Sequence, residues 1–267
     1  MDFSSSQSTY QRIYSQPAYV LHTTAYQNTS LLVDAFTAEF GRIRFVAKGA
    51  KRLKSTFAGK LQVFTPLLLS WSGRGDLYTL TDADFANFQQ RSFLNGQLQL
   101  RGSVLLSSYY LNELILRFVT LEDPHPELFY HYVEALDKLL VKQNIESVLR
   151  IFEKYLLHET GYTLMLTQDA QTGEDVVAES NYYYALTDIE GPVRAESSVE
   201  THAENSMLQF NYDSICVSGK TLLELERGIF SDNETLKQAK ILMRSIIAKH
   251  LGGEPLKTRT LFQSTIL

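Results

Sequence analysis

The spacing of apolar residues changes near residue 86, and this change constrains the fold more than any other feature of the sequence. Before it, β-forming runs occur at 18–24, 31–37, 42–48, 62–72 and 77–81. In the third run Arg42 and Arg44 alternate with apolar residues, which is the period of a strand with one buried face. Five short strands joined by turns, one of them at Gly41, predict a small closed barrel.

After residue 86 the apolar residues recur with a period of about 3.6, which is typical of helices. Helices are expected at 102–121, 126–142, 145–159, 221–227 and 234–251, and strand-like fragments at 182–186 and 214–218. The sequence therefore predicts an α+β chain of several domains. Its expected parts are a flexible tail at 1–16, a barrel domain at 17–85, and an α-helical domain at 86–267 with an irregular acidic segment at 163–218.

The net charge of −5 conceals an uneven distribution of charged residues. Residues 1–80 carry nine Lys or Arg and four Asp or Glu, whereas residues 121–234 carry seven and 22. The densest basic stretch, 41–60, holds seven cations and no acid. Such a stretch is usually a solvated face. In an otherwise acidic protein it favours nucleic-acid binding, because contacts to phosphates need Lys and Arg.

The sequence lacks the motifs of catalysis and of nucleotide or metal binding. Gly219-Lys220-Thr221 resembles the end of a phosphate-binding loop, but Ser214 stands where the first glycine is required, so Lys220 is expected at the start of a helix. The six histidines are scattered, and Cys216, between two apolar residues, is expected to be a buried structural thiol. We therefore expect no catalytic residue, no metal site and no cofactor.

The sequence also carries no targeting or membrane signal. The N-terminal residues are polar, and no window holds the ~20 apolar residues that a membrane-spanning helix needs. A single cysteine fits a reducing compartment. We expect a cytoplasmic protein with no membrane partner, which would be associated with the nucleoid as a DNA binder.

Several sequence blocks, in the same order along the chain, match those of one known family. The most specific block is Val46-Ala47-Lys48-Gly49-Ala50-Lys51-Arg52. Weaker ones lie at 19–23, 37–42, 64–67, 110–114, 150–153 and 251–259. Together they span nearly the whole chain, which resembles the bacterial RecO family of recombination mediators.

This resemblance implies an OB-fold barrel followed by a helical domain, and the binding of single-stranded and double-stranded DNA with annealing of complementary strands without ATP. It also implies three partners: RecR, the C-terminal tail of the single-stranded-DNA-binding protein, and, as a functional link, RecA, which is loaded onto coated DNA. Many members carry a four-cysteine zinc module after the third helix. Residues 166–170 lack its first cysteine pair, so the chain is similar to the zinc-free members. An alternative is a protein–protein adaptor of a repair complex that binds DNA only weakly.

The matching blocks imply DNA contacts at Lys48, Lys51 and Arg52. The neighbouring cations Arg42, Arg44 and Lys54 are expected to assist, and Arg74, in a turn between two glycines, is included as a further phosphate contact. A second basic set, on the face of the last long helix, consists of Lys237, Lys240 and Arg244. For this set, DNA contact and simple solvent exposure near the helix C-terminus are equally open.

The resemblance also implies a receptor for the partner's tail. That tail ends in acidic residues, an aromatic residue and a free carboxylate, so its receptor needs a cation beside an apolar groove. Arg150, in the first half of the third helix, is expected to be this cation. The alternative is a surface arginine that pairs with Glu146 or Glu153.

Overall fold

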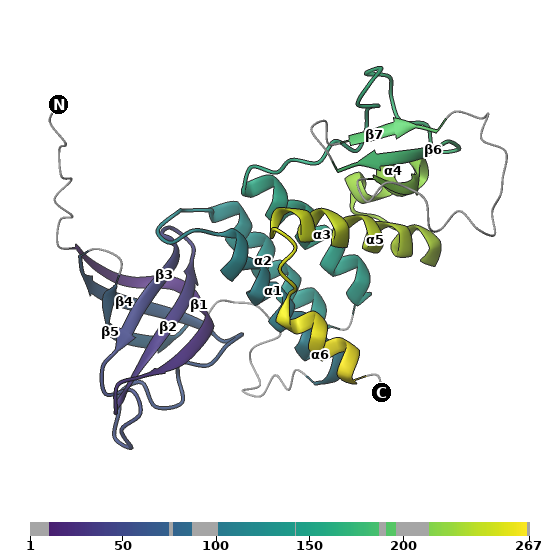
Figure 1. The fold of residues 1–267 in the computed structure, drawn as a ribbon. Coiled ribbons are helices and arrows are strands. Elements are labelled where there is room, and N and C mark those ends of the chain that lie inside the picture. The colour runs from purple at the N-terminus through teal and green to yellow at the C-terminus, as the bar shows by residue number, and fades with distance from the viewer. Residues whose placement is uncertain are drawn as a thin grey trace, which may run out of the picture. The chain divides into compact units, whose positions relative to one another are not determined.

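The computed structural model of the chain describes residues 11–74, 77–86, 101–141, 143–186, 191–195 and 214–265. The chain divides into two compact units, Met1–Val141 and Lys142–Leu267 (Figure 1). The expected domain boundary after residue 85 falls inside the first unit. The first unit thus contains the expected barrel together with the first two helices of the expected helical domain.

The first unit contains a barrel of five strands: β1 (Gln11–Tyr26), β2 (Ser30–Thr37), β3 (Gly41–Ala47), β4 (Pro66–Gly73) and β5 (Tyr78–Phe85). They pair in the order β1-β2-β3-β5-β4, and β4 pairs with β1, which closes the barrel. Every pair is antiparallel except β3 with β5. This confirms the predicted barrel, whose five strands have the arrangement of an OB-like fold.

The strand register follows the period-two pattern of the sequence. Ile43 and Phe45 are buried in the barrel core, and Phe45 packs against Trp71 of β4 with ring centroids 5.1 Å apart. Strand β1 begins at Gln11, although a flexible tail was expected up to residue 16, because residues 11–13 pair with residues 71–73 of β4. Pro66 is the first residue of β4, a position where the missing N–H of proline is tolerated.

Two helices pack on the outside of the barrel: α1 (Gly102–Phe118) and α2 (Pro126–Leu140). Asn112 of α1 donates from Nδ2 to a β1 carbonyl at 2.9 Å and accepts from the hydroxyl of Tyr132 in α2 at 2.7 Å. The ring of Tyr132 also packs against Tyr19 and Phe36, which point outward from β1 and β2. These buried contacts make α1 and α2 part of the first unit.

The second unit contains four helices and three strands in its described residues: α3 (Ile145–Glu159), β6 (Asn181–Ala185), β7 (Gly191–Arg194), β8 (Ser214–Ser218), α4 (Gly219–Arg227), α5 (Asn233–His250) and α6 (Lys257–Thr265). The strands form a sheet in the order β7-β6-β8, so the segment expected to be irregular is partly ordered. Strand β7 and helix α6 were not predicted, because such short elements show too few repeats of a period.

Cys216 lies in the middle of β8, and its side chain is exposed. The expectation of a buried thiol was therefore wrong. Side chains alternate between the two faces of a strand, and the neighbouring Val217 is the one that is buried. In this strand the apolar residues on either side of Cys216 face the core, and the side chain of Cys216 therefore faces away from it.

Asp169 organises the loop between α3 and β6. Its Oδ1 accepts from the backbone N–H groups of Gln171 and Thr172, each at 2.9 Å, and its Oδ2 accepts from that of Arg194 in β7 at 2.7 Å. Burial alone would raise the pKa of Asp169, but these backbone bonds hold the pKa below its usual value. A carboxylate therefore ties the loop at 169–172 to β7.

In the part of the chain that the structure describes, no helix is both long enough and apolar enough to cross a membrane.

Asp232 caps α5 by accepting from the N–H of Thr235 at 2.8 Å. Lys220 lies in the first turn of α4, as expected, and its Nζ contacts Asp232 at 2.6 Å. Lys220 thus helps to join α4 to α5 and is not part of a phosphate-binding loop.

Candidate nucleic-acid interface

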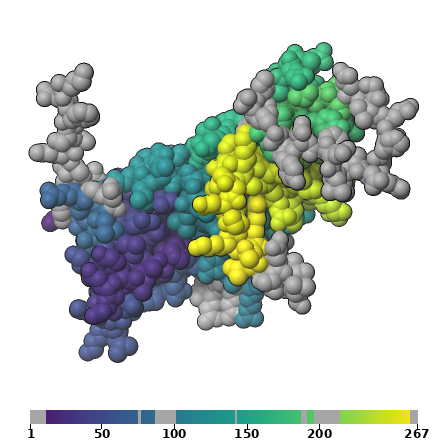
Figure 2. All heavy atoms as spheres, viewed as in Figure 1, coloured from purple at the N-terminus to yellow at the C-terminus, as the bar shows by residue number. Residues whose placement is uncertain are grey.

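The basic loop, residues 48–60, leaves the barrel where β3 ends, and it projects from the barrel surface (blue, at the lower left of Figure 2). Gly49 turns the chain with a φ of +71°, which glycine adopts at little cost. The N–H of Lys51 donates to the carbonyl of Thr29 at 2.9 Å, and that of Gly49 donates to Ser30 Oγ at 3.4 Å. The start of the loop is therefore fixed to the turn between β1 and β2.

Five of the expected DNA-binding cations are exposed on the barrel: Lys48, Lys51, Arg52, Lys54 and Arg74. Arg74 lies in the bend after β4, and the other four lie in the basic loop. No ion pair found among the described residues includes any of them. Their charges are therefore available to the phosphates of a bound strand.

The other two expected contacts, Arg42 and Arg44, form hydrogen bonds and ion pairs with other residues of the protein. Arg44 pairs with Asp34 of β2, with 2.9 Å between Nη2 and Oδ1. Arg42 Nη1 donates to the carbonyls of Leu116 at 2.5 Å and Val119 at 2.9 Å, at the C-terminal end of α1. Burial of this guanidinium lowers the pKa of Arg42, and the charge of Asp34 partly offsets the effect. Arg42 thus holds α1 on the barrel.

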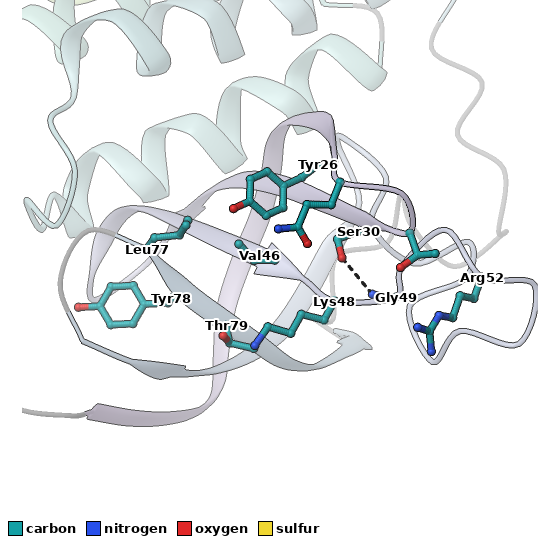
Figure 3. A pocket seen from close by; sticks show the side chains of 11 residues that line it. Tyr26, Ser30, Val46, Lys48, Gly49, Arg52, Leu77, Tyr78 and Thr79 are labelled. Atoms are coloured by element: carbon teal, nitrogen blue, oxygen red, sulfur yellow. Dashed lines mark hydrogen bonds between the residues drawn. The ribbon is translucent and has the colours of Figure 1, made fainter.

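A cavity of about 430 Å³ lies beside the basic loop (Figure 3). Its lining residues come from the turn between β1 and β2 (26–30), from the end of β3 and the basic loop (46–52), and from the start of β5 (77–79). They include Lys48 and Arg52, and no Asp or Glu is among them. OB-folds bind oligonucleotides on the face of strands 2 and 3 and on the loops between strands 1 and 2 and between strands 4 and 5, which is where this cavity lies.

The sequence did not indicate the uncharged residues of this cavity that lie outside the basic block: Tyr26, Gln27, Thr29, Ser30, Leu77, Tyr78 and Thr79. They lie far from the basic block in the sequence and carry no charge. The parallel pairing of Val46 in β3 with Thr79 in β5 brings the segments together. Only the strand order of the resembled fold could have indicated these residues. It places the first and last turns of the barrel near the end of the third strand.

Arg150, the expected receptor for a partner's tail, is almost completely buried in α3 with 3% of its surface exposed. Its Nη2 donates to Glu153, which is itself buried. The pairing with Glu153 agrees with the alternative interpretation. The burial of Arg150 does not, because that interpretation places the arginine on the surface. Glu146, the other partner considered for Arg150, pairs with Lys240 of α5, with 2.7 Å between Nζ and Oε1.

Of the basic set on α5, Lys240 is therefore engaged by Glu146, while Lys237 and Arg244 are exposed. Within the described residues, no three side chains of His, Cys, Asp or Glu gather in a way that could hold a metal ion. The exposed cations on the barrel and the neighbouring cavity are thus the strongest candidate site in the described part of the chain.

Comparison with known proteins identifies the family to which the chain is related. Residues 12–88 match the family described as "Recombination protein O N terminal", and residues 102–260 match "Recombination protein O C terminal". The chain belongs to the RecO family of DNA repair proteins. This confirms the resemblance inferred from the sequence blocks, and the N-terminal match covers the barrel from residue 12 onward.

Relatives that carry the name DNA repair protein RecO align with nearly the full length of the chain. The protein of Azoarcus sp. is 40% identical over 96% of this chain and 98% of its own length. That of Nitrosospira multiformis is 40% identical over 95% of this chain and 96% of its own length. That of Nitrosococcus oceani is 42% identical, with 94% of each chain covered. The RecO likeness therefore extends through both units.

Proposed function

We propose that this chain is a mediator of DNA repair and recombination that binds single-stranded and double-stranded DNA and anneals complementary strands without ATP. The observation that supports this most strongly is a group of exposed cations on the OB-like barrel of a RecO-family chain, Lys48, Lys51 and Arg52, for which the described residues show no ion pair. Two strands can pair only when the repulsion between their phosphates is reduced, and cations do this without hydrolysing a nucleotide. The proposed activity is therefore not enzymatic.

The proposal includes the partners that the family implies. Together with RecR, the protein helps RecA to load on DNA that is coated with the single-stranded-DNA-binding protein, in the cytoplasm at the nucleoid. The C-terminal tail of that coating protein docks on the helical part, with Arg150 as its cation. In support, Nε and Nη1 of Arg150 have no hydrogen-bond partner among the described residues. Because Arg150 is buried, a carboxylate reaches these donors only after neighbouring side chains move.

The DNA-binding site is tested by measuring the affinity for a labelled single strand over a range of salt concentrations. The triple variant Lys48→Ala/Lys51→Ala/Arg52→Ala removes three phosphate contacts. Each contact contributes about 0.7 to the slope of log affinity against log salt for single strands, so we expect this slope to fall by about 2. Unchanged affinity and slope would exclude this site and favour the adaptor alternative.

A matched control removes exposed cations from the second unit. Lys237→Ala/Arg244→Ala takes two positive charges from α5 and leaves the barrel untouched. We expect this variant to keep most of the affinity and the slope of the wild type. A loss per removed charge as large as that of the triple variant would show that DNA binding is not localised on the barrel.

A further inference from the structure

We propose that the cavity beside the basic loop holds one unpaired nucleotide, with its phosphate at Lys48 and Arg52 and its base against Tyr26. The barrel then favours single-stranded over double-stranded DNA. This inference rests on the proposed function, because it assigns a substrate class to the same face of the barrel. It adds a recognition element, the base, that phosphate contacts alone do not provide.

The charges of the cavity fit a phosphate. Lys48 and Arg52 are both exposed, and no carboxylate lines the cavity to compete for them. Figure 3 shows that the side chain of Lys48 extends toward Thr79, while Arg52 lies at the end of the cavity that is farther from Leu77. A strand that crosses the cavity therefore meets positive charge on one side and a largely uncharged wall on the other.

The uncharged wall fits a nucleobase. Two tyrosines line the cavity, but the ring of Tyr78 belongs to the barrel core, and its hydroxyl donates to Glu122 at 3.1 Å. The ring of Tyr26 is half-buried and points toward Leu77, which is 42% exposed (Figure 3). A base that enters here finds an aromatic face and an aliphatic side chain. Gln27 and Thr79 add polar groups for the edge of the base.

The size of the cavity suits a single nucleotide. Its volume of about 430 Å³ lies in the lower part of the range for ligand pockets. In a duplex, the base would first have to leave the stack and lose its partner, which costs a few kcal/mol. In a single strand most of this cost is absent, so the unpaired strand binds more tightly.

This arrangement gives the annealing reaction a direction. A strand enters the cavity through an unpaired base, while the cations of the basic loop neutralise its phosphates. When a complementary strand arrives, pairing withdraws the base from the cavity, and the duplex keeps only its phosphate contacts. The product is therefore bound more weakly than the substrate and is released.

The test compares two probes of equal length and charge, oligothymidylate and the corresponding abasic deoxyribose-phosphate strand, by fluorescence anisotropy. Stacking of one base on an aromatic side chain contributes enough for the wild-type protein to bind the thymidylate strand about fivefold or more tightly. We expect Tyr26→Ala to reduce this ratio to about one and to leave binding of the abasic strand and of duplex unchanged. Tyr26→Phe should retain the ratio, because it keeps the ring.

Two further variants make the outcome decisive. Leu77→Ala removes the opposite apolar wall at a position that is 42% exposed, and it should also reduce the ratio. Tyr14→Ala removes a tyrosine of β1 that is 66% exposed and does not line the cavity, so it should leave the ratio unchanged. Equal binding of both probes by the wild type, or an equal loss for both in Tyr26→Ala, would overturn the nucleotide site.

The result is independent of the test of the proposed function. If the triple variant of the basic loop weakens all DNA binding but Tyr26→Ala has no selective effect, the nucleotide site is wrong and the phosphate-binding loop stands. If the triple variant has no effect on DNA binding, the proposed function of the basic loop fails, whatever the result for Tyr26→Ala.

Discussion

Replacing Arg42 with alanine should destabilise the protein without weakening its binding to DNA, even though Arg42 lies in the same basic stretch as Lys48. In the structure, Nη1 of Arg42 donates to two carbonyls at the end of α1, those of Leu116 and Val119, at 2.5 and 2.9 Å. The same guanidinium lies 3.8 Å from Asp34 Oδ1. The alanine variant loses all three interactions and the positive charge at a helix C-terminus.

The size of the effect follows from these contacts. A hydrogen bond from a charged donor contributes about 1.5–3 kcal/mol, and a cation at a helix C-terminus adds a fraction of this. Arg42 is only partly buried, and water can replace it at the freed carbonyls, so we expect a total loss of about 3 kcal/mol. For a chain of this size, that corresponds to a melting temperature lower by ~10 °C.

Two measurements separate the structural role from the DNA-binding role. Thermal unfolding gives the loss of stability, and the salt dependence of single-strand binding, measured well below the melting temperature, gives the number of phosphate contacts. Lys48→Ala is the matched control, since it should show the reverse pattern: an unchanged melting temperature and a slope lower by about 0.7. The reasoning is refuted if Arg42→Ala melts like the wild type and lowers the slope as Lys48→Ala does.

Two predictions concern the second unit. Because backbone N–H groups lower the pKa of Asp169 in the folded state, its stabilisation is present at neutral pH and is lost as the pH falls below about 4, toward the folded value. The stability difference between wild type and Asp169→Asn, measured by urea unfolding, should therefore shrink from pH 5 to pH 3, and a constant difference would contradict it. Arg150→Ala breaks a buried ion pair and should cost about 3 kcal/mol. The folded variant should also bind a peptide of the coating protein's tail more weakly, and equal affinity would remove Arg150 from that site.

The barrel was predictable because its strands follow a local rule. Alternation in the third strand placed Ile43 and Phe45 in the core, and Gly41, where a turn was expected, has a positive φ. The charge distribution indicated the basic stretch, and the family resemblance singled out Lys48, Lys51 and Arg52, which the structure places in an exposed loop. These features depend on neighbours in the sequence, which a reader of the sequence can see.

The remaining features depend on contacts between residues that are distant in the sequence. Arg42 and Arg44 look equivalent in the strand, but only Arg42 meets the end of α1, 74 residues further along. The attachment of α1 through Asn112 depends on a β1 carbonyl 91 residues away, so the boundary between the units could not be placed. Tyr26 joins the cavity because β2 pairs with both β1 and β3, which places the end of β1 beside the start of the basic loop.

The most direct test of the central claim is a strand-annealing assay with complementary labelled oligonucleotides, without ATP and without added metal. The account predicts that the wild-type protein accelerates annealing, and that Lys48→Ala/Lys51→Ala/Arg52→Ala loses most of this acceleration while keeping the melting temperature of the wild type. An equal acceleration by the folded triple variant, or none by the wild type, would contradict the claim that the basic loop brings the strands together.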